Sequence, residues 1–174
     1  MKSILTLLLM GIAAQAASVP SMGLEELVDR SEAIVHGRVV RSWSAWDDAH
    51  KYIWTHHLIA VIDRVRGAGA GMVVASEPGG ELGGVGMRVS GAVEYGVGEE
   101  AILFLYRTPV GYLRATGHGQ GKYTVTPEMR VRANLKGLDL LKVNAARGAD
   151  LSSLDGLTVA DFKARVRETM RGRR

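Results

Sequence analysis

The 174-residue sequence contains no cysteine, few aromatic residues and no apolar run long enough to cross a membrane. The absence of cysteine excludes disulfides, thiol catalysis, cysteine-ligated zinc and iron–sulfur clusters. The fold must therefore be held together by its core alone. The formal net charge is only +4, and part of that excess comes from the arginines that close the chain, which is typical of a solvated tail rather than of a nucleic-acid-binding surface.

Residues 1–16 have the three parts of a secretory signal peptide. A positive start at Lys2 precedes an apolar run at residues 4–14, and residues 14–16 (Ala-Gln-Ala) have the small-x-small pattern of a signal peptidase site. A membrane anchor needs about 20 apolar residues, so this run is too short to be one. We expect cleavage after Ala16 and a mature chain in the periplasm or outside the cell. The alternative interpretation is a buried N-terminal helix.

The remaining chain predicts a short helix, a long β region and a closing helix. Ser21 is a candidate N-cap for the first helix, and Gly37 is expected to mark a bulge or bend in the first strand. Residues 101–106 form the most apolar predicted strand and the expected centre of the core. Thr158, with Asp161 three residues later, resembles a capping box at the start of the closing helix. Further strands are expected at residues 33–43, 52–65, 72–76, 112–116 and, as the last of the set, 122–125.

Short strands separated by glycine turns, with no strand–helix alternation, favour a barrel or sandwich over a parallel α/β sheet. We predict a mainly β fold: a small OB-like antiparallel barrel of about five or six strands with a short N-terminal helix and a C-terminal helix. Residues 17–126 are expected to form the barrel domain. Residues 127–174 are expected to hold a poorly defined segment, the C-terminal helix and a basic tail.

Several sequence blocks follow one another in a distinctive order. A VxGxV stretch at residues 35–39 precedes the blocks at residues 77–84 (EPGGELGG), 98–105 (GEEAILFL) and 119–123 (GQGKY). In that order they resemble an uncharacterised family of bacterial exported proteins, over residues 24–125, and this resemblance implies no established activity. A more distant similarity is to the netrin-like domain, the OB-type barrel of the tissue inhibitors of metalloproteinases, and it implies a barrel fold. Those inhibitors use a cysteine-bearing N-terminus, which this chain lacks.

No arrangement of residues predicts catalysis, a metal site or a cofactor. His56 and His57 are adjacent in a predicted strand, so their side chains should point to opposite faces and not share a metal. No serine lies in a Gly-x-Ser-x-Gly nucleophile elbow. The Glu99-Glu100 pair is expected to start a strand rather than to face a partner carboxylate across a cleft, as glycosidase carboxylates do.

The glycine-rich segment at residues 79–91 is the most unusual part of the sequence. It lacks the Gly-Lys-Ser/Thr of a P-loop and does not lead from a strand into a helix, as a dinucleotide-binding turn does. Long loops are uncommon in compact domains unless they are functional, so we expect residues 79–87 to form part of a partner-contacting surface, joined by residues 118–122. The alternative is a structural loop whose glycines allow positive φ angles. The candidate binding residues are Gly79, Gly80, Glu81, Gly83, Gly84, His118, Gln120 and Lys122.

A second candidate surface combines aromatic residues on either side of the bend at residues 47–48. A hairpin at this bend would bring some of them together. Exposed aromatic side chains bind sugars or peptides and are enriched in the cores of interfaces. The alternative is that they cover one end of the barrel as part of its core. These residues are Trp43, Trp46, Tyr52 and Trp54.

Together these features favour a non-enzymatic recognition module that binds a protein partner outside the cytoplasm. Neither nucleic acid nor a membrane span after signal cleavage is expected. One alternative function is an inhibitor or accessory subunit of an exported protease, which rests on the netrin-like similarity. A second alternative is a hydrolase of unknown specificity.

Overall fold

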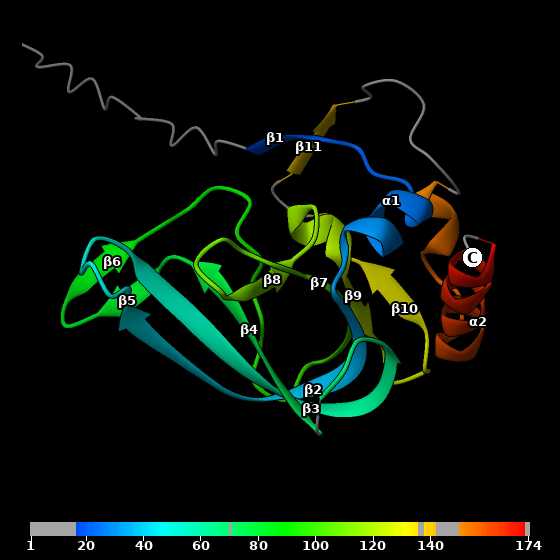
Figure 1. Cartoon of the computed structure of the whole chain (residues 1–174), viewed down its shortest axis with the longest axis horizontal. Coiled ribbons are helices and arrows are strands. Elements are labelled where there is room, and N and C mark those ends of the chain that lie inside the picture. Colours follow the sequence, from blue (N-terminus) through cyan, green and yellow to red (C-terminus); the bar gives the residue numbers. More distant parts are fainter. Residues whose placement is uncertain (1–16, 70, 136–137, 142–149, 173–174) are drawn as a thin grey trace, which may run out of the picture.

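A computed structural model describes residues 17–69, 71–135, 138–141 and 150–172. The predicted signal peptide at residues 1–16 lies outside the described residues. Figure 1 shows the two α-helices on one side of the main sheet and the hairpin β5–β6 at the opposite end. The elements in chain order are β1 (Ala17–Pro20), α1 (Leu24–Arg30), β2 (Ala33–Trp46), β3 (Ile53–Arg66), β4 (Met72–Pro78), β5 (Gly80–Leu82), β6 (Val85–Met87), β7 (Glu100–Arg107), β8 (Leu113–Ala115), η1 (His118–Gly121), β9 (Lys122–Val125), β10 (Val131–Ala133), β11 (Leu138–Leu141), η2 (Leu151–Leu154) and α2 (Val159–Arg171).

Seven strands form the main sheet, in the order β10-β9-β7-β2-β3-β4-β8. Strand β8 also pairs with β7, so the pairings run in a ring through β7, β2, β3, β4 and β8. Within this ring only the β4–β8 pairing is parallel. The predicted mainly β fold with two flanking helices is confirmed at this level.

Strand β7 is buried on both faces, as its apolar sequence predicts. Residues Ala101, Leu103 and Leu105 face the interior of the ring, where they pack with Val35 and Ile59. The alternate residues point to the helices instead. The most apolar predicted strand is therefore the centre of the core.

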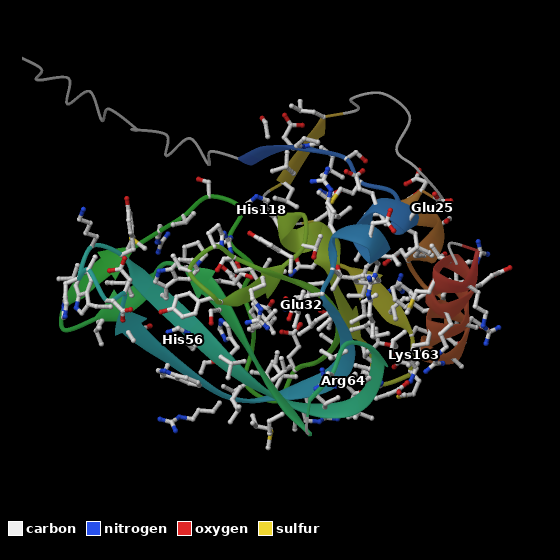
Figure 2. The ribbon with its side chains drawn as sticks, viewed as in Figure 1. Glu25, Glu32, His56, Arg64, His118 and Lys163 are labelled. Carbon is white, nitrogen blue, oxygen red and sulfur yellow. The ribbon has the colours of Figure 1, made fainter. Side chains whose placement is uncertain are left out.

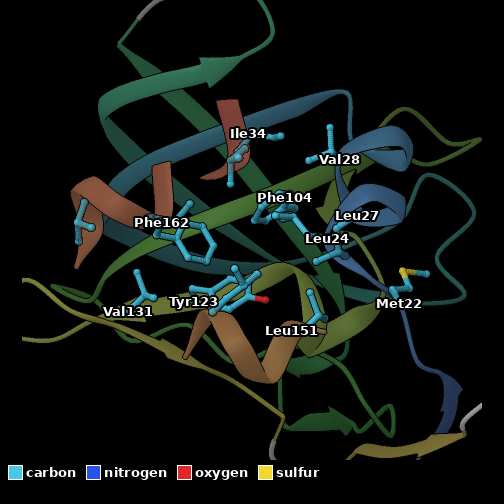
Figure 3. Close-up of a cluster of buried hydrophobic side chains, with 14 residues drawn as sticks. Met22, Leu24, Leu27, Val28, Ile34, Phe104, Tyr123, Val131, Leu151 and Phe162 are labelled. Carbon is cyan, nitrogen blue, oxygen red and sulfur yellow. The ribbon is translucent and has the colours of Figure 1, made fainter. Parts of the chain in front are cut away.

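The second part of the core joins the sheet to the helices (Figure 3). Phe104 of β7, Tyr123 of β9 and Phe162 of α2 pack together, and the Tyr123 and Phe162 ring centroids are 4.6 Å apart. Leu24 and Leu27 of α1 complete the cluster. Burying these side chains offsets the conformational entropy that a chain without disulfides loses on folding.

The helix ends match the sequence only in part. The Thr158 hydroxyl accepts a hydrogen bond from the Asp161 N–H at 3.1 Å, so the predicted cap of α2 is confirmed. The prediction of Ser21 as the first cap is wrong: Gly23 occupies the N-cap of α1 and supplies no side chain. The first turn of α1 instead begins with two glutamates, which suit the positive end of the helix dipole.

Three further parts of the chain differ from the sequence-based expectation. Strands β10 and β11 follow residue 125, so the strand predicted as last is not the last one. The glycine-rich loop contains the short hairpin β5–β6 rather than irregular chain alone. The register does shift next to Gly37, but the extra residue there is Ile62 of β3; in β2 itself the extra residue is Val40, between Val39 and Arg41.

Candidate functional site

Aromatic side chains cluster on the side of β2 and β3 that faces away from the ring interior. Trp43 lies opposite His56 in the β2–β3 pairing, and their ring centroids are 5.3 Å apart. Tyr112, from the connection between β7 and β8, packs edge-on against Trp54 at 4.9 Å and against His56 at 5.3 Å. Figure 2 shows His56 on the part of the sheet distant from the helices. The hairpin thus brings Trp43 and Trp54 to one cluster, with His56 between them.

Trp46 and Tyr52, the other two members of the predicted aromatic surface, lie apart from this cluster. Successive residues of a strand point to opposite faces, so Trp46 faces the other side of β2 from Trp43. The Trp46 ring lies 6.4 Å from that of His50. Tyr52 is 57% exposed and lies in the connection between β2 and β3.

Two arginines flank the aromatic cluster. The guanidinium carbon of Arg41 lies 5.2 Å from the ring centroid of Trp43, and that of Arg114 lies 5.9 Å from the ring centroid of Trp54. Both are cation–π distances. The cluster therefore combines an apolar surface with positive charge at its rim.

Aliphatic side chains continue the same face along β3 and β4. Leu58 lies opposite Val74, and Ala60 lies opposite Met72. Met72 is 54% exposed and Val74 is 37% exposed. We call this surface the outer face, and it consists of Trp43, Trp54, His56, Leu58, Met72, Val74 and Tyr112.

The glycine-rich segment borders a separate cavity of about 800 Å³ on the inner side of the β3–β4 end. Gly79, Gly80 and Glu81 line it, whereas Gly83 and Gly84 form the tip of the hairpin. Gly80 has a φ of +132°, and a Cβ there would lie 2.3 Å from the Thr55 hydroxyl oxygen. Close packing therefore requires a glycine at position 80, which agrees with the alternative that the glycine-rich segment is a structural loop.

The floor of this cavity holds three buried polar side chains: His57, Glu77 and Tyr95. The rings of His57 and Tyr95 lie 4.4 Å apart. The Glu77 carboxylate accepts hydrogen bonds from the Arg114 guanidinium at 3.1 Å and from the Ala115 N–H at 3.0 Å. The Tyr95 hydroxyl is buried and has no hydrogen-bond partner among the described residues.

Burial shifts the pKa of each of these groups. It lowers the pKa of His57 to about 4, with the nearby Lys122 ammonium acting in the same direction. It raises the pKa of Glu77 despite the Arg114 guanidinium, and it raises the pKa of Tyr95 well above the usual value. At neutral pH the floor thus offers an uncharged imidazole and a protonated phenol. These groups suit hydrogen bonding to a ligand better than proton transfer.

The adjacent residues His56 and His57 of β3 each form a hydrogen bond with a serine of a neighbouring strand. The two histidines lie on opposite faces of the sheet, as the sequence predicts. Ser42 lies 2.8 Å from His57 Nδ1, and Ser76 lies 2.8 Å from His56 Nδ1. In neither pair does a described carboxylate bind the second ring nitrogen. Ser76 is also buried. Ser42 is only half-buried, so what both pairs lack among the described residues is the orienting acid of a hydrolytic triad.

Residues 118–122, which are predicted to join the surface of the glycine-rich segment, make hydrogen bonds with several segments of the chain. Lys122 is 2% exposed, and its ammonium donates hydrogen bonds to the Glu99 carboxylate at 2.8 Å and to the Glu94 carbonyl. Gln120 accepts a hydrogen bond from the Met22 N–H at 2.8 Å. His118 lies on η1, with its Nδ1 3.1 Å from the Gly91 carbonyl oxygen (Figure 2).

Sequence reasoning missed Glu77, Tyr95, Tyr112 and Arg114 as site residues. Their neighbours in the fold are distant in the sequence: Arg114 reaches Glu77 across 37 positions. No local pattern marks them. The one available signal for Tyr112 is its place next to a glycine turn, close to the end of the apolar strand.

Among the described residues, no three or more His, Asp or Glu side chains are placed to hold a metal ion. No helix in that part of the chain is both long and apolar enough to cross a membrane. Comparison with models of known protein families and with curated proteins gave no match.

Proposed function

We propose that this protein is an exported recognition module that binds a protein partner through the outer face. The observation that carries the proposal is the outer face of β2, β3 and β4, where the exposed side chains of Met72 and Val74 continue a cluster of half-buried aromatic side chains. Soluble proteins seldom expose contiguous apolar surface of this kind except where they bind something. Tryptophan, tyrosine, methionine and arginine, all of which occur here, are enriched in the centres of protein interfaces.

We also propose that the ring of strands is an OB-type barrel. In chain order, its five strands neighbour one another as first, second, third, fifth, fourth and first again, with the third and fifth parallel. This is the strand order of OB-type barrels, which bind ligands on the face of their second and third strands and on the loop between the fourth and fifth. Here these are β3, β4 and the connection that carries Tyr112. The outer face therefore coincides with the binding position of the proposed fold class.

The charge at the rim indicates the chemistry of the partner. Arg41 is exposed and lies over Trp43, whereas Arg114 lies over Trp54, is 15% exposed and pairs with the buried Glu77. A partner surface with apolar side chains at its centre and acidic ones at its edge would complement this arrangement. Export is proposed from the pattern of residues 1–16 alone.

A pull-down from the envelope and extracellular fractions of the source, identified by mass spectrometry, tests the proposal. Met72→Glu places a charge on the outer face and is expected to weaken capture of the partner at least about tenfold, since a buried unpaired charge is costly. Met129→Glu is the matched control: Met129 is 50% exposed, close to the 54% of Met72, but lies in the β9–β10 turn. Equal capture by both variants, or no stoichiometric partner of the unaltered protein, would overturn the proposal. If the captured partner is a protease, the result would support the alternative function as an inhibitor or accessory subunit of an exported protease.

A further inference from the structure

The second half of β2 has one free edge. On the side away from β3, strand β7 pairs with β2 only from Ala33 to Arg38, and Val39 then exchanges backbone hydrogen bonds with Gly98 and Glu99. Beyond the extra residue Val40, no described strand pairs with this edge. Figure 1 shows this part of β2 as the lower border of the sheet, with no ribbon beyond it.

The hydrogen-bond pattern shows which backbone groups face this edge. The Asp47 N–H donates to the Tyr52 carbonyl at 2.9 Å, and the Ile53 carbonyl accepts from Gly79 on the opposite side of β3. Because bonding direction alternates along an antiparallel pair, residues 41, 43 and 45 bond to β3. The backbone groups of residues 42, 44 and 46 therefore point to the free edge.

We propose that this edge pairs with the same edge of a second copy of the chain, antiparallel, about a twofold axis through Ser44. Ser44 then faces Ser44 of the second copy, and Ser42 faces Trp46 of the second copy. Each of the three resulting pairs exchanges two N–H···O bonds, about six in all. A closed twofold interface of this kind uses one surface patch in both copies.

The side chains of the segment complement themselves in this register. On the outer side, Trp43 lies beside Ala45 of the second copy, so a large residue faces a small one. Farther along, Arg41 lies beside Asp47 of the second copy, so opposite charges meet across the strands. On the inner side, Trp46 lies beside the small Ser42. A shift by one residue would turn every side chain to the wrong face. A shift by two residues would keep the faces but place Trp43 beside Trp43 or beside Asp47 of the second copy, so the side-chain matches favour the register centred on Ser44.

Within residues 42–46 (Ser-Trp-Ser-Ala-Trp) the edge has neither a proline nor a charged residue, two of the devices that keep edge strands apart. The bulge at Val40 and the charged Arg41 lie just before this segment. Their pairing would join the two outer faces into one surface, with the Trp43 rings of both copies close to its centre. The inference does not depend on the proposed protein partner.

A single cysteine tests the register, because the chain has none of its own. In the proposed pair the two residues 44 are about 5.5 Å apart between Cα atoms, within the range that a disulfide spans. Ser44→Cys is expected to form a covalent dimer on mild oxidation. Arg41→Cys is the control, since its two copies would lie about 20 Å apart along the strands, and it should stay monomeric.

A second pair of variants tests the backbone pairing by sedimentation over a range of concentrations. Ser44→Pro removes the outward N–H and keeps the bonds to β3, a position at which edge strands tolerate proline. It should weaken self-association at least about 30-fold, since each dimer loses two backbone hydrogen bonds. Ser44→Ala removes the same hydroxyl, keeps the N–H, and should associate like the unaltered protein.

Three results would overturn the inference: a monomer at every concentration, equal cross-linking of both cysteine variants, or a dimer that a folded Ser44→Pro protein retains. If Ser44→Pro fails to fold, as judged by circular dichroism, the cysteine pair alone decides. Loss of partner capture by Met72→Glu with an intact dimer would leave this inference standing.

Discussion

The buried ion pair between Lys122 and Glu99 offers the sharpest test of how the loop before β7, which carries Glu94, Tyr95 and Glu99, is held in place. Lys122 is 2% exposed, and its ammonium lies 2.8 Å from Glu99 and 4.7 Å from the centroid of the Tyr95 ring. It also donates a hydrogen bond to the carbonyl of Glu94. One side chain of β9 thus fixes the loop that covers the end of the ring. Lys122→Met keeps most of the aliphatic stem and removes the charge.

The expected loss in the free energy of unfolding is about 3 kcal/mol, the lower end of the range for breaking a buried ion pair by removing one partner. The lower end applies because the Glu99 side chain remains 19% exposed and can still be hydrated. With a urea slope near 2 kcal/mol per molar, the midpoint of urea unfolding should fall by about 1.5 M.

The pH dependence gives an independent readout of the same contact. Burial alone would raise the pKa of Glu99, but hydrogen bonds from Lys122 and Thr124 outweigh it and hold the pKa below the ordinary value of 4.5. A carboxyl whose pKa is lowered on folding stabilises the protein above its unfolded pKa and loses that contribution as the pH falls through the folded pKa. The difference between the unaltered protein and Lys122→Met should therefore narrow below about pH 4.5.

Arg107→Met is the control. It removes a cation from the Arg107–Glu32 pair, in which the side chains are 51% and 48% exposed. Exposed pairs contribute little, so the midpoint should move far less than for Lys122→Met. The reasoning is refuted if the two substitutions cost the same, or if the loss in Lys122→Met is unchanged at acid pH.

Two further predictions concern the same end of the molecule. In thermal unfolding, Gly80→Ala should destabilise the fold more than Gly83→Ala. A Cβ at Gly80 would meet the hydroxyl oxygens of Thr55 and Ser44, whereas nothing lies within 4 Å of a Cβ at Gly83. Equal melting temperatures of the two variants would contradict this reasoning. His57, whose pKa is lowered to about 4, loses its stabilising contribution as the pH falls from 6.5 toward 4. In a His57→Gln variant the free energy of unfolding should change less steeply with pH between about pH 4 and 6.5, by up to about 1.4 kcal/mol per pH unit. An unchanged slope, or titration of the imidazole near pH 6.5 by NMR, would show that the ring is hydrated.

The sequence predicted only part of the aromatic cluster, because only some of its contacts arise from residues close together in the chain. The bend at residues 47–48 is a local signal, so the hairpin that joins Trp43 and Trp54 follows from the sequence. The opposite orientation of Trp46 follows from strand alternation as well, once the strand boundaries are known. What the sequence could not place is Tyr112, which reaches the cluster from the connection between β7 and β8.

The sequence by itself determined the mainly β character, the place of β7 at the centre of the core and the capped start of α2. Each depends on residues that are neighbours along the chain: an apolar run, or a threonine three residues before an aspartate. Only the tertiary structure decided that the strands pair in a ring, that Arg114 reaches Glu77, and that Lys122 is buried against Glu99. These contacts join segments that no local pattern relates, and they form because ring closure brings the segments together and burial then requires each charge to find a partner.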